Sequence, residues 1–253
     1  MTGQVVVLLH AFPLDHRLWQ QQATRLTGLG FTVITPDLPG FGGTALLDTA
    51  PSLEAVADHV LAQLDGQGID RCILGGVSLG GYVTMAMLRT RPAIADGAVL
   101  CGTKATADGD QARANRERLA QLVLDTPRDC ARVLEQAVLP GLLGDTSRAE
   151  RPAVVTQVRD WLGDAPAETV AWYQRAMAVR PDSLDVLAGV EVPALVVWGA
   201  EDALSPRAEQ DLMIDVLPAG RLDVIESAGH LALIERPDAV GDAIVRFVED
   251  RQT

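Results

Sequence analysis

Positively charged residues are scarce in this chain. Its 253 residues include 21 lysines and arginines against 34 aspartates and glutamates, so the formal net charge is −13 and the isoelectric point is near 4.6. Because nucleic-acid phosphates are bound by Lys and Arg, this balance argues against a nucleic-acid partner. It also disfavours a polyanionic substrate such as acyl-CoA, since the sequence shows no clear local cluster of arginines.

Cysteines and long apolar runs are scarce as well. Cys72, Cys101 and Cys130 have neither metal-binding spacing nor the even number of a disulfide framework, so we expect free thiols in a reducing compartment. No apolar run approaches the roughly 20 residues that a membrane span needs. The first residues lack the charged start of a signal peptide, and the apolar run after them ends at Leu9. We therefore expect a cytoplasmic protein without membrane contact.

Apolar residues make up 48% of the chain and fall in short runs that alternate with helical patterns. This alternation is typical of an α/β domain, in which helices cover both faces of a parallel sheet, and the length suits one such domain. The predicted strands are 4–9, 31–35, 70–75, 96–101, 193–198 and 220–225. The predicted helices are 16–28, 53–66, 80–90, 205–216 and 231–249.

Residues 104–188 interrupt the alternation because they contain no convincing strand. Prolines divide this segment into about four helices, and these prolines are Pro127, Pro140, Pro152 and Pro166. Loops at the rim of such a sheet hold the site, so we expect the segment to cover it. The alternative is that its helices pack against the edge of the sheet. The predicted domains are a core of residues 1–103 and 189–253 and a helical cap of residues 104–188.

The most informative motif is Gly76-Val77-Ser78-Leu79-Gly80, between a predicted strand and a predicted helix. Gly-x-Ser-x-Gly in this context is typical of a nucleophile elbow, a turn so tight that its flanking residues must be glycine. The turn projects the serine hydroxyl above the sheet, next to the first amides of the following helix. Ser78 is therefore the candidate nucleophile.

A serine hydroxyl needs a base, and the base needs an acid that orients it. Glu201 and Asp202 follow one predicted strand, and His230 follows the next. The carboxyl ends of parallel strands meet at one edge of the sheet, and the order Ser, Asp or Glu, His fits the elbow. His230 is the candidate base, while Asp202 and Glu201 compete for the role of the acid.

These motifs resemble those of serine hydrolases with the α/β-hydrolase fold, in particular small bacterial esterases and enol-lactonase-like proteins. The resemblance covers nearly the whole chain and also includes residues 10–13, 37–42 and 235–237. It implies that Asp202 is the acid and that the amides of Phe12 and Leu79 form an oxyanion hole.

Members of this superfamily mostly have an antiparallel hairpin before the first parallel strand, whereas this chain begins almost directly with that strand. We therefore expect about six strands, all parallel, and no leading hairpin. The first strand should lie near the centre of the sheet, beside the strand before Ser78.

The function implied is hydrolysis of a small, mainly apolar carboxylic ester or lactone through an acyl-enzyme at Ser78, with no cofactor and no metal. The same triad can also cleave C–C bonds or form peracids. A third possibility is a small-molecule receptor without turnover. A fold hosts many functions, so the sequence leaves these alternatives open.

Other polar residues are assigned supporting roles. We expect His10 to orient the loop after the first strand, Asp37 to tie loops together, and Glu235 to make a structural ion pair or cap. His16 and His59 should face solvent. Side chains that either line a pocket or pack in the core are Tyr82, Trp172, Tyr173, Met177 and Leu204.

Overall fold

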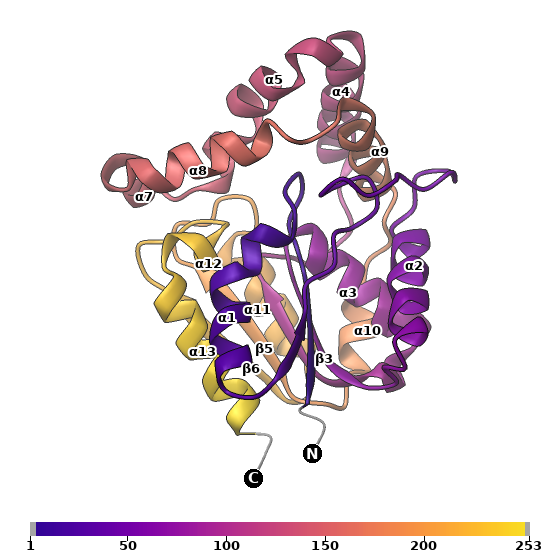
Figure 1. Ribbon diagram of the computed structural model, residues 1–253, viewed down its shortest axis with the longest axis vertical. Coiled ribbons are helices and arrows are strands. Elements are labelled where there is room, and N and C mark those ends of the chain that lie inside the picture. Colours follow the sequence, from indigo (N-terminus) through magenta and orange to yellow (C-terminus); the bar gives the residue numbers. More distant parts are fainter. Residues whose placement is uncertain (1–3, 251–253) are drawn as a thin grey trace.

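The protein is built on a six-stranded sheet in which each neighbouring pair of strands is parallel. The computed structural model describes residues 4–250, and Figure 1 shows the sheet enclosed by helices. The strand order is β2-β1-β3-β4-β5-β6. The strands are β1 (Val5–Leu9), β2 (Thr32–Ile34), β3 (Cys72–Val77), β4 (Ala95–Cys101), β5 (Ala194–Gly199) and β6 (Gly220–Ile225).

The predicted strands are confirmed, with small differences at their boundaries. β1 lies between β2 and β3, so it is next to the strand that leads to Ser78, as expected. Every residue of β3 is buried, which explains why this strand is a continuous apolar run rather than an alternating one. The predicted absence of a leading hairpin concerns the residues before β1, and of these residues 1–3 lie outside the described part of the chain.

Helices cover both faces of the sheet (Figure 1). On one face α1 (Gln20–Gly28) packs against α13 (Pro237–Glu249). On the other face the helices follow one another in contact, in the order α2 (Leu53–Gly66), α3 (Leu79–Thr90), α10 (Leu184–Ala188) and α11 (Arg207–Val216). The predicted layering is therefore confirmed.

The single helix predicted over residues 231–249 is wrong, because the chain forms α12 (Ala232–Glu235) and then α13. Arg236 between them has φ −137°, and Pro237 is the first residue of α13. A residue before proline avoids the helical conformation, whereas proline itself suits the first turn of a helix. The break leaves Glu235 buried at the end of α12, shortly after His230.

Residues 104–188 contain helices and no strand, as predicted, but the helices are shorter and more numerous than the four expected. Besides α10 they are α4 (Asp110–Asp125), α5 (Cys130–Ala137), α6 (Leu139–Leu142), α7 (Asp145–Glu150), α8 (Pro152–Leu162) and α9 (Ala167–Ala178). The prolines mark several helix starts, and a further break at Gly144 was missed. In Figure 1, α4, α5, α7, α8 and α9 gather beyond one end of the sheet, opposite to the start of β1. That end carries the carboxyl termini of the strands.

The turn between β3 and α3 is crowded by backbone on both sides. A Cβ at Gly76 would collide with the backbone of Gly80, and a Cβ at Gly80 would collide with the Leu9 carbonyl of β1. Ser78 itself has φ 54° and ψ −112°, a conformation that L-residues rarely adopt. The two glycines therefore let the turn close tightly enough to hold Ser78 in this conformation.

We predict that Gly76→Ala lowers the free energy of unfolding by more than about 3 kcal/mol, because a backbone collision cannot be relieved by a side-chain rotation. Gly66→Ala is the matched control, since a Cβ there meets nothing within 4 Å. That change should be neutral or stabilise by up to about 1 kcal/mol. Urea denaturation measures both, and equal effects of the two substitutions would contradict the steric account.

Candidate active site

Ser78 lies where β3 ends and α3 begins. Its amide donates to the Cys101 carbonyl at 3.0 Å. Its carbonyl accepts from the Thr103 hydroxyl at 2.9 Å and from the Tyr82 amide at 3.2 Å. The backbone is thus held from both sides, whereas the Ser78 hydroxyl forms no hydrogen bond with another residue of the described chain and lines a pocket.

His230 and Asp202 are brought together from the ends of β6 and β5. His230 Nδ1 lies 2.9 Å from Asp202 Oδ2, and both side chains are buried. The amides of Leu204 and Ser205 donate to Asp202 Oδ1 at 2.8 and 3.1 Å, and the Ser205 hydroxyl donates to Oδ2. Because the ionised Asp202 carboxylate can only accept hydrogen bonds, His230 Nδ1 must carry the ring proton that is donated to it. The lone pair of Nε2 is then available to take a proton.

The Asp202 carboxyl remains ionised despite its burial. Burial alone raises its pKa, but the charge and hydrogen bond of His230 and the donors of Ser205 outweigh that effect, so the pKa of Asp202 lies below its usual range. Glu201 contacts a different group, because its carboxylate accepts from the amide of Thr146 at 2.9 Å. The structure therefore brings Asp202, and not Glu201, to His230.

Two residues beside this pair were missed by the sequence reasoning. Gly102, just after β4, has φ +46°, and a Cβ there would lie 2.6 Å from the His230 carbonyl and 3.5 Å from Asp202 Oδ2. Ser205 donates to the Asp202 carboxylate, as described above. The spacing Asp-x-x-Ser is a common turn pattern, so Ser205 was detectable in principle. Nothing in the sequence around Gly102 indicates its proximity to His230, which is distant along the chain.

The loop after β1 reaches the same pocket through Phe12. The Phe12 amide donates to no side chain and to no loop carbonyl among residues 4–250. Leu79 is the first residue of α3, so its amide has no carbonyl partner within the helix. Both amides named from the sequence are therefore available as donors beside Ser78.

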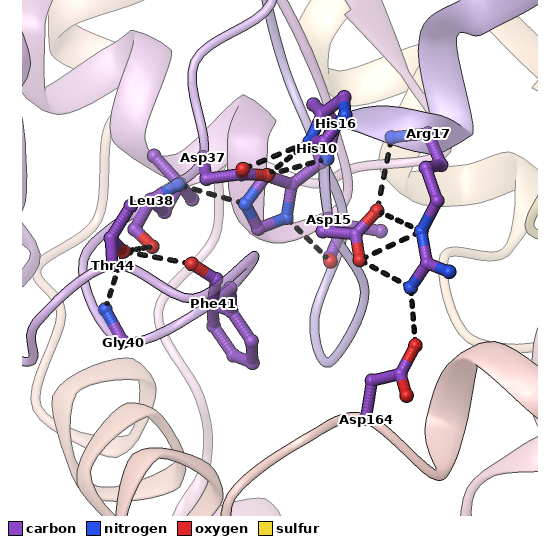
Figure 2. Close-up of polar contacts among 11 residues, drawn as sticks. His10, Asp15, His16, Arg17, Asp37, Leu38, Gly40, Phe41, Thr44 and Asp164 are labelled. Atoms are coloured by element: carbon purple, nitrogen blue, oxygen red, sulfur yellow. Dashed lines mark hydrogen bonds and ion pairs between the residues drawn. The ribbon is translucent and has the colours of Figure 1, made fainter.

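A buried histidine joins this loop to the loop after β2 (Figure 2). The Leu38 amide donates to His10 Nε2 at 2.9 Å, so the ring proton is on Nδ1, which donates to the Ala11 carbonyl at 3.0 Å. Burial lowers the pKa of His10, and the ring stays neutral. Both ring nitrogens are occupied, which suits an orienting role next to Phe12 and leaves no nitrogen for proton transfer.

Asp15, His16 and Asp37 form a group whose possible ligand atoms lie within 4.8 Å of one another. Figure 2 shows that these groups are already paired. His16 Nδ1 contacts Asp37 Oδ2 at 2.8 Å, and Arg17 Nη2 contacts Asp15 Oδ2 and Asp164 Oδ2 at 2.6 Å each. We assign no metal to this group, which ties the loops after β1 and β2 to the loop between α8 and α9.

The pocket beside Ser78 and His230 has a volume of about 500 Å³. Residues from 104–188 supply most of its remaining wall, and the apolar ones among them are Ala112, Leu119, Ala137, Val138, Leu142 and Met177. Tyr82 and Leu204 also line it, as considered from the sequence. Trp172 and Tyr173 instead pack against each other in the core, with ring centroids 5.0 Å apart.

One wall of the pocket is charged, and here the sequence-based expectation of no local cluster of cations is wrong. Lys104, Arg116 and Arg180 all contact the carboxylate of Asp108. Lys104, Asp108 and Arg116 line the pocket that holds Ser78. The cluster was missed because its members come from separate elements and meet only in the folded chain.

Glu235 holds the backbone next to His230. Its carboxylate accepts from the Gly229 amide at 2.8 Å and from the Gly144 amide at 2.9 Å. Burial raises the pKa of Glu235, although both amides favour the ionised form. The predicted structural role is therefore carried by two backbone donors, one of them in the segment of residues 104–188.

We predict that Glu235→Gln lowers the free energy of unfolding by about 1–3 kcal/mol, because the new amide group faces a donor and leaves it without an acceptor. The control is Glu249→Gln at the exposed end of α13, which should change stability by less than about 0.5 kcal/mol. Chemical denaturation measures both variants. Equal unfolding free energies for the two would show that the bonds to Gly144 and Gly229 contribute nothing.

Comparison with known proteins identifies the class to which this fold and site belong. The sequence model of the alpha/beta hydrolase family matches residues 6–243, and the chain belongs to that family. A curated relative is the pimeloyl-[acyl-carrier protein] methyl ester esterase of Aeromonas hydrophila, which is 28% identical over 97% of this chain and 96% of its own length.

Solved structures resemble the chain over nearly its full length. A thermophilic esterase from Thermogutta terrifontis, described with malate bound, has a TM-score of 0.94 and 36% identity, covering 100% of this chain and 92% of its own. The enol-lactonase from Burkholderia xenovorans shares the fold, with a TM-score of 0.88 and 24% identity over 98% of this chain and 92% of its own. Among the residues that the structure describes, no helix is long and apolar enough to cross a membrane.

Proposed function

We propose that this protein is a serine hydrolase that cleaves a carboxylic ester or lactone through an acyl-enzyme intermediate. Its family and the esterases it resembles indicate a hydrolase acting on ester bonds. The observation that carries the mechanism is the pairing of His230 with Asp202 at the pocket into which Ser78 opens. A buried acid, an oriented base and an unbonded hydroxyl are the parts that nucleophilic acyl transfer needs.

In the proposed reaction Ser78 Oγ attacks the ester carbonyl while His230 Nε2 takes the hydroxyl proton. Asp202 keeps the proton of Nδ1 in place and stabilises the imidazolium that forms. His230 then gives the proton to the leaving alcohol. A water molecule, deprotonated by the same histidine, hydrolyses the acyl-enzyme and releases the acid.

The negative oxygen of the tetrahedral intermediate is assigned to the amides of Phe12 and Leu79. Two preorganised donors at this position stabilise charge as it develops and contribute several kcal/mol to the rate. His10 supports this assignment, since its bond to the Ala11 carbonyl fixes the peptide group before Phe12.

The segment of residues 104–188 is proposed to act as a cap that selects the substrate. It supplies most of the apolar wall of the pocket that Ser78 lines, which favours a substrate with an apolar acyl or ring portion. The pocket volume of about 500 Å³ suits a small ester. The free, buried cysteines favour a reducing compartment, and we propose the cytoplasm.

We predict that Ser78→Ala reduces kcat for p-nitrophenyl esters by at least about 10³-fold, as loss of the nucleophile does in other triads. The thermal midpoint should stay within a few degrees, because the hydroxyl makes no hydrogen bond within the described chain. Ser227→Ala is the matched control, since Ser227 has a similar φ of 55° and lies outside the pocket. Retention of more than about a tenth of the activity in Ser78→Ala would refute the assignment of the nucleophile.

We predict that Asp202→Asn lowers kcat far more than Glu201→Gln, by up to about 10⁴-fold. An amide in place of the Asp202 carboxylate would donate to Nδ1 and favour the wrong histidine tautomer. Glu201→Gln should leave kcat nearly unchanged, because Glu201 contacts Thr146 and not His230. Steady-state kinetics of the two variants measures the difference. A larger loss of kcat in Glu201→Gln than in Asp202→Asn would identify Glu201 as the acid.

A further inference from the structure

The charged wall of the pocket is built around Asp108, whose side chain is 1% exposed. Lys104 Nζ lies 3.4 Å from Asp108 Oδ1, Arg180 Nη1 lies 3.0 Å from the same oxygen, and Arg116 Nε contacts Oδ2. Burial alone would raise the pKa of Asp108, but Arg116 and Arg180 more than offset it and the pKa stays below its usual range. Three cations therefore surround one carboxylate, and the cluster carries an excess of positive charge.

Arg180 is a buried member of this cluster and binds backbone carbonyls as well as Asp108. Its guanidinium donates to the carbonyls of Met177 and Thr106 at 2.8 and 2.9 Å, and it lies 4.0 Å from the centre of the Tyr82 ring. Its side chain is 4% exposed. Asp108 supplies one negative charge for three cations, and Arg180 is buried within the protein, so an excess of positive charge remains at Lys104 and Arg116, which line the pocket.

Lys104 and Arg116 keep donors that no described residue accepts. Among residues 4–250, the ion pair with Asp108 is the only hydrogen bond or ion pair of Lys104 Nζ. Arg116 uses Nε for Asp108 and Nη1 for Gln174 Oε1, at 3.2 Å, and for Met177 Sδ, so Nη2 is without a partner in the same range. The two side chains are 19% and 20% exposed, and both line the pocket.

The backbone connects Lys104 to the turn that holds Ser78. Lys104 directly follows Thr103, whose hydroxyl donates to the Ser78 carbonyl at 2.9 Å. Lys104 is also the single lysine of the whole chain. Lys104 and Arg116 therefore line the same cavity as Ser78 and His230, and apolar residues of α4, α5, α6 and α9 form a large part of its remaining wall.

We propose that Lys104 and Arg116 bind a carboxylate of the substrate, so that the preferred substrate is a monoester of a short dicarboxylic acid. The inference rests on the proposed ester hydrolysis at Ser78. The carbon chain between the two carbonyl groups lies against the apolar wall, and the free carboxylate receives charge-assisted hydrogen bonds from the Lys104 ammonium and the Arg116 guanidinium. Two side chains suit one anionic group, whereas the overall charge of −13 disfavours polyanions.

The test compares monomethyl esters of succinic, glutaric, adipic and pimelic acid with neutral esters of matched shape. For glutarate the neutral match is methyl 5-methylhexanoate, in which an isopropyl group replaces the carboxylate. We expect kcat/KM for at least one monoanion to exceed that of its neutral match by about tenfold or more, the factor of one charge-assisted hydrogen bond. The preference should fall as salt is added, since the donors are partly exposed.

Lys104→Met should reduce the preference for the monoanion by about ten- to a hundredfold, and Lys104→Arg should retain most of it. Asp108 keeps two arginine partners in both variants, so we expect both to fold, and thermal midpoints check this. The control is Arg118→Met, an exposed position on the same helix α4 that does not line the pocket. It should leave the preference unchanged. Equal effects of Lys104→Met and Arg118→Met, or the absence of any preference in the wild type, would overturn the inference.

A binding measurement separates failure of this inference from failure of the proposed function. If no ester is hydrolysed, the proposed function fails, and calorimetric titration with monomethyl glutarate and with methyl 5-methylhexanoate then decides on the anion site. Tighter binding of monomethyl glutarate than of its neutral match, weakened at least about tenfold in Lys104→Met, would support the site. Equal affinities for monomethyl glutarate in the wild type and in Lys104→Met would overturn it.

Discussion

The arrangement of the site depends on how closely three backbone segments approach at the turn after β3. The carbonyl of Leu9 at the end of β1 abuts Gly80, and Gly80 in turn abuts Gly76. This crowding forces Ser78 into a conformation with positive φ, and the Cys101 carbonyl and the Thr103 hydroxyl hold it there. One consequence is that the loop after β1, which carries Phe12, is fixed beside the serine.

The other half of the site is held by hydrogen bonds rather than by steric contact. Asp202 is surrounded by donors from Ser205 and His230, so a buried charge is compensated without a cation of its own. Glu235 binds the amide before His230 and an amide of the segment 104–188 at the same time. Glu235 thereby ties that segment to the loop that carries the histidine.

The net charge of the chain differs in sign from the charge that lies beside the pocket. The chain as a whole is strongly acidic, yet Lys104, Arg116 and Arg180 converge on one carboxylate beside the pocket. Most of the other ion pairs lie at the surface, where each contributes little to stability. Cations with free donors matter here because they face a partly enclosed cavity, where water screens them less.

The sequence by itself predicted the parallel sheet, the elbow at Ser78 and the order of Ser78, a carboxylate at Glu201 or Asp202, and His230. These features are local: continuous apolar runs, glycines two residues from a serine, and polar residues just after strands are all visible in short windows. The tertiary structure alone decided that Asp202 rather than Glu201 meets His230, that Gly102 must leave room for the pair, and that Trp172 packs in the core while Met177 lines the pocket. It also decided the cluster around Asp108, because which side chains from distant elements face one cavity depends on how α4 and α9 pack over the sheet.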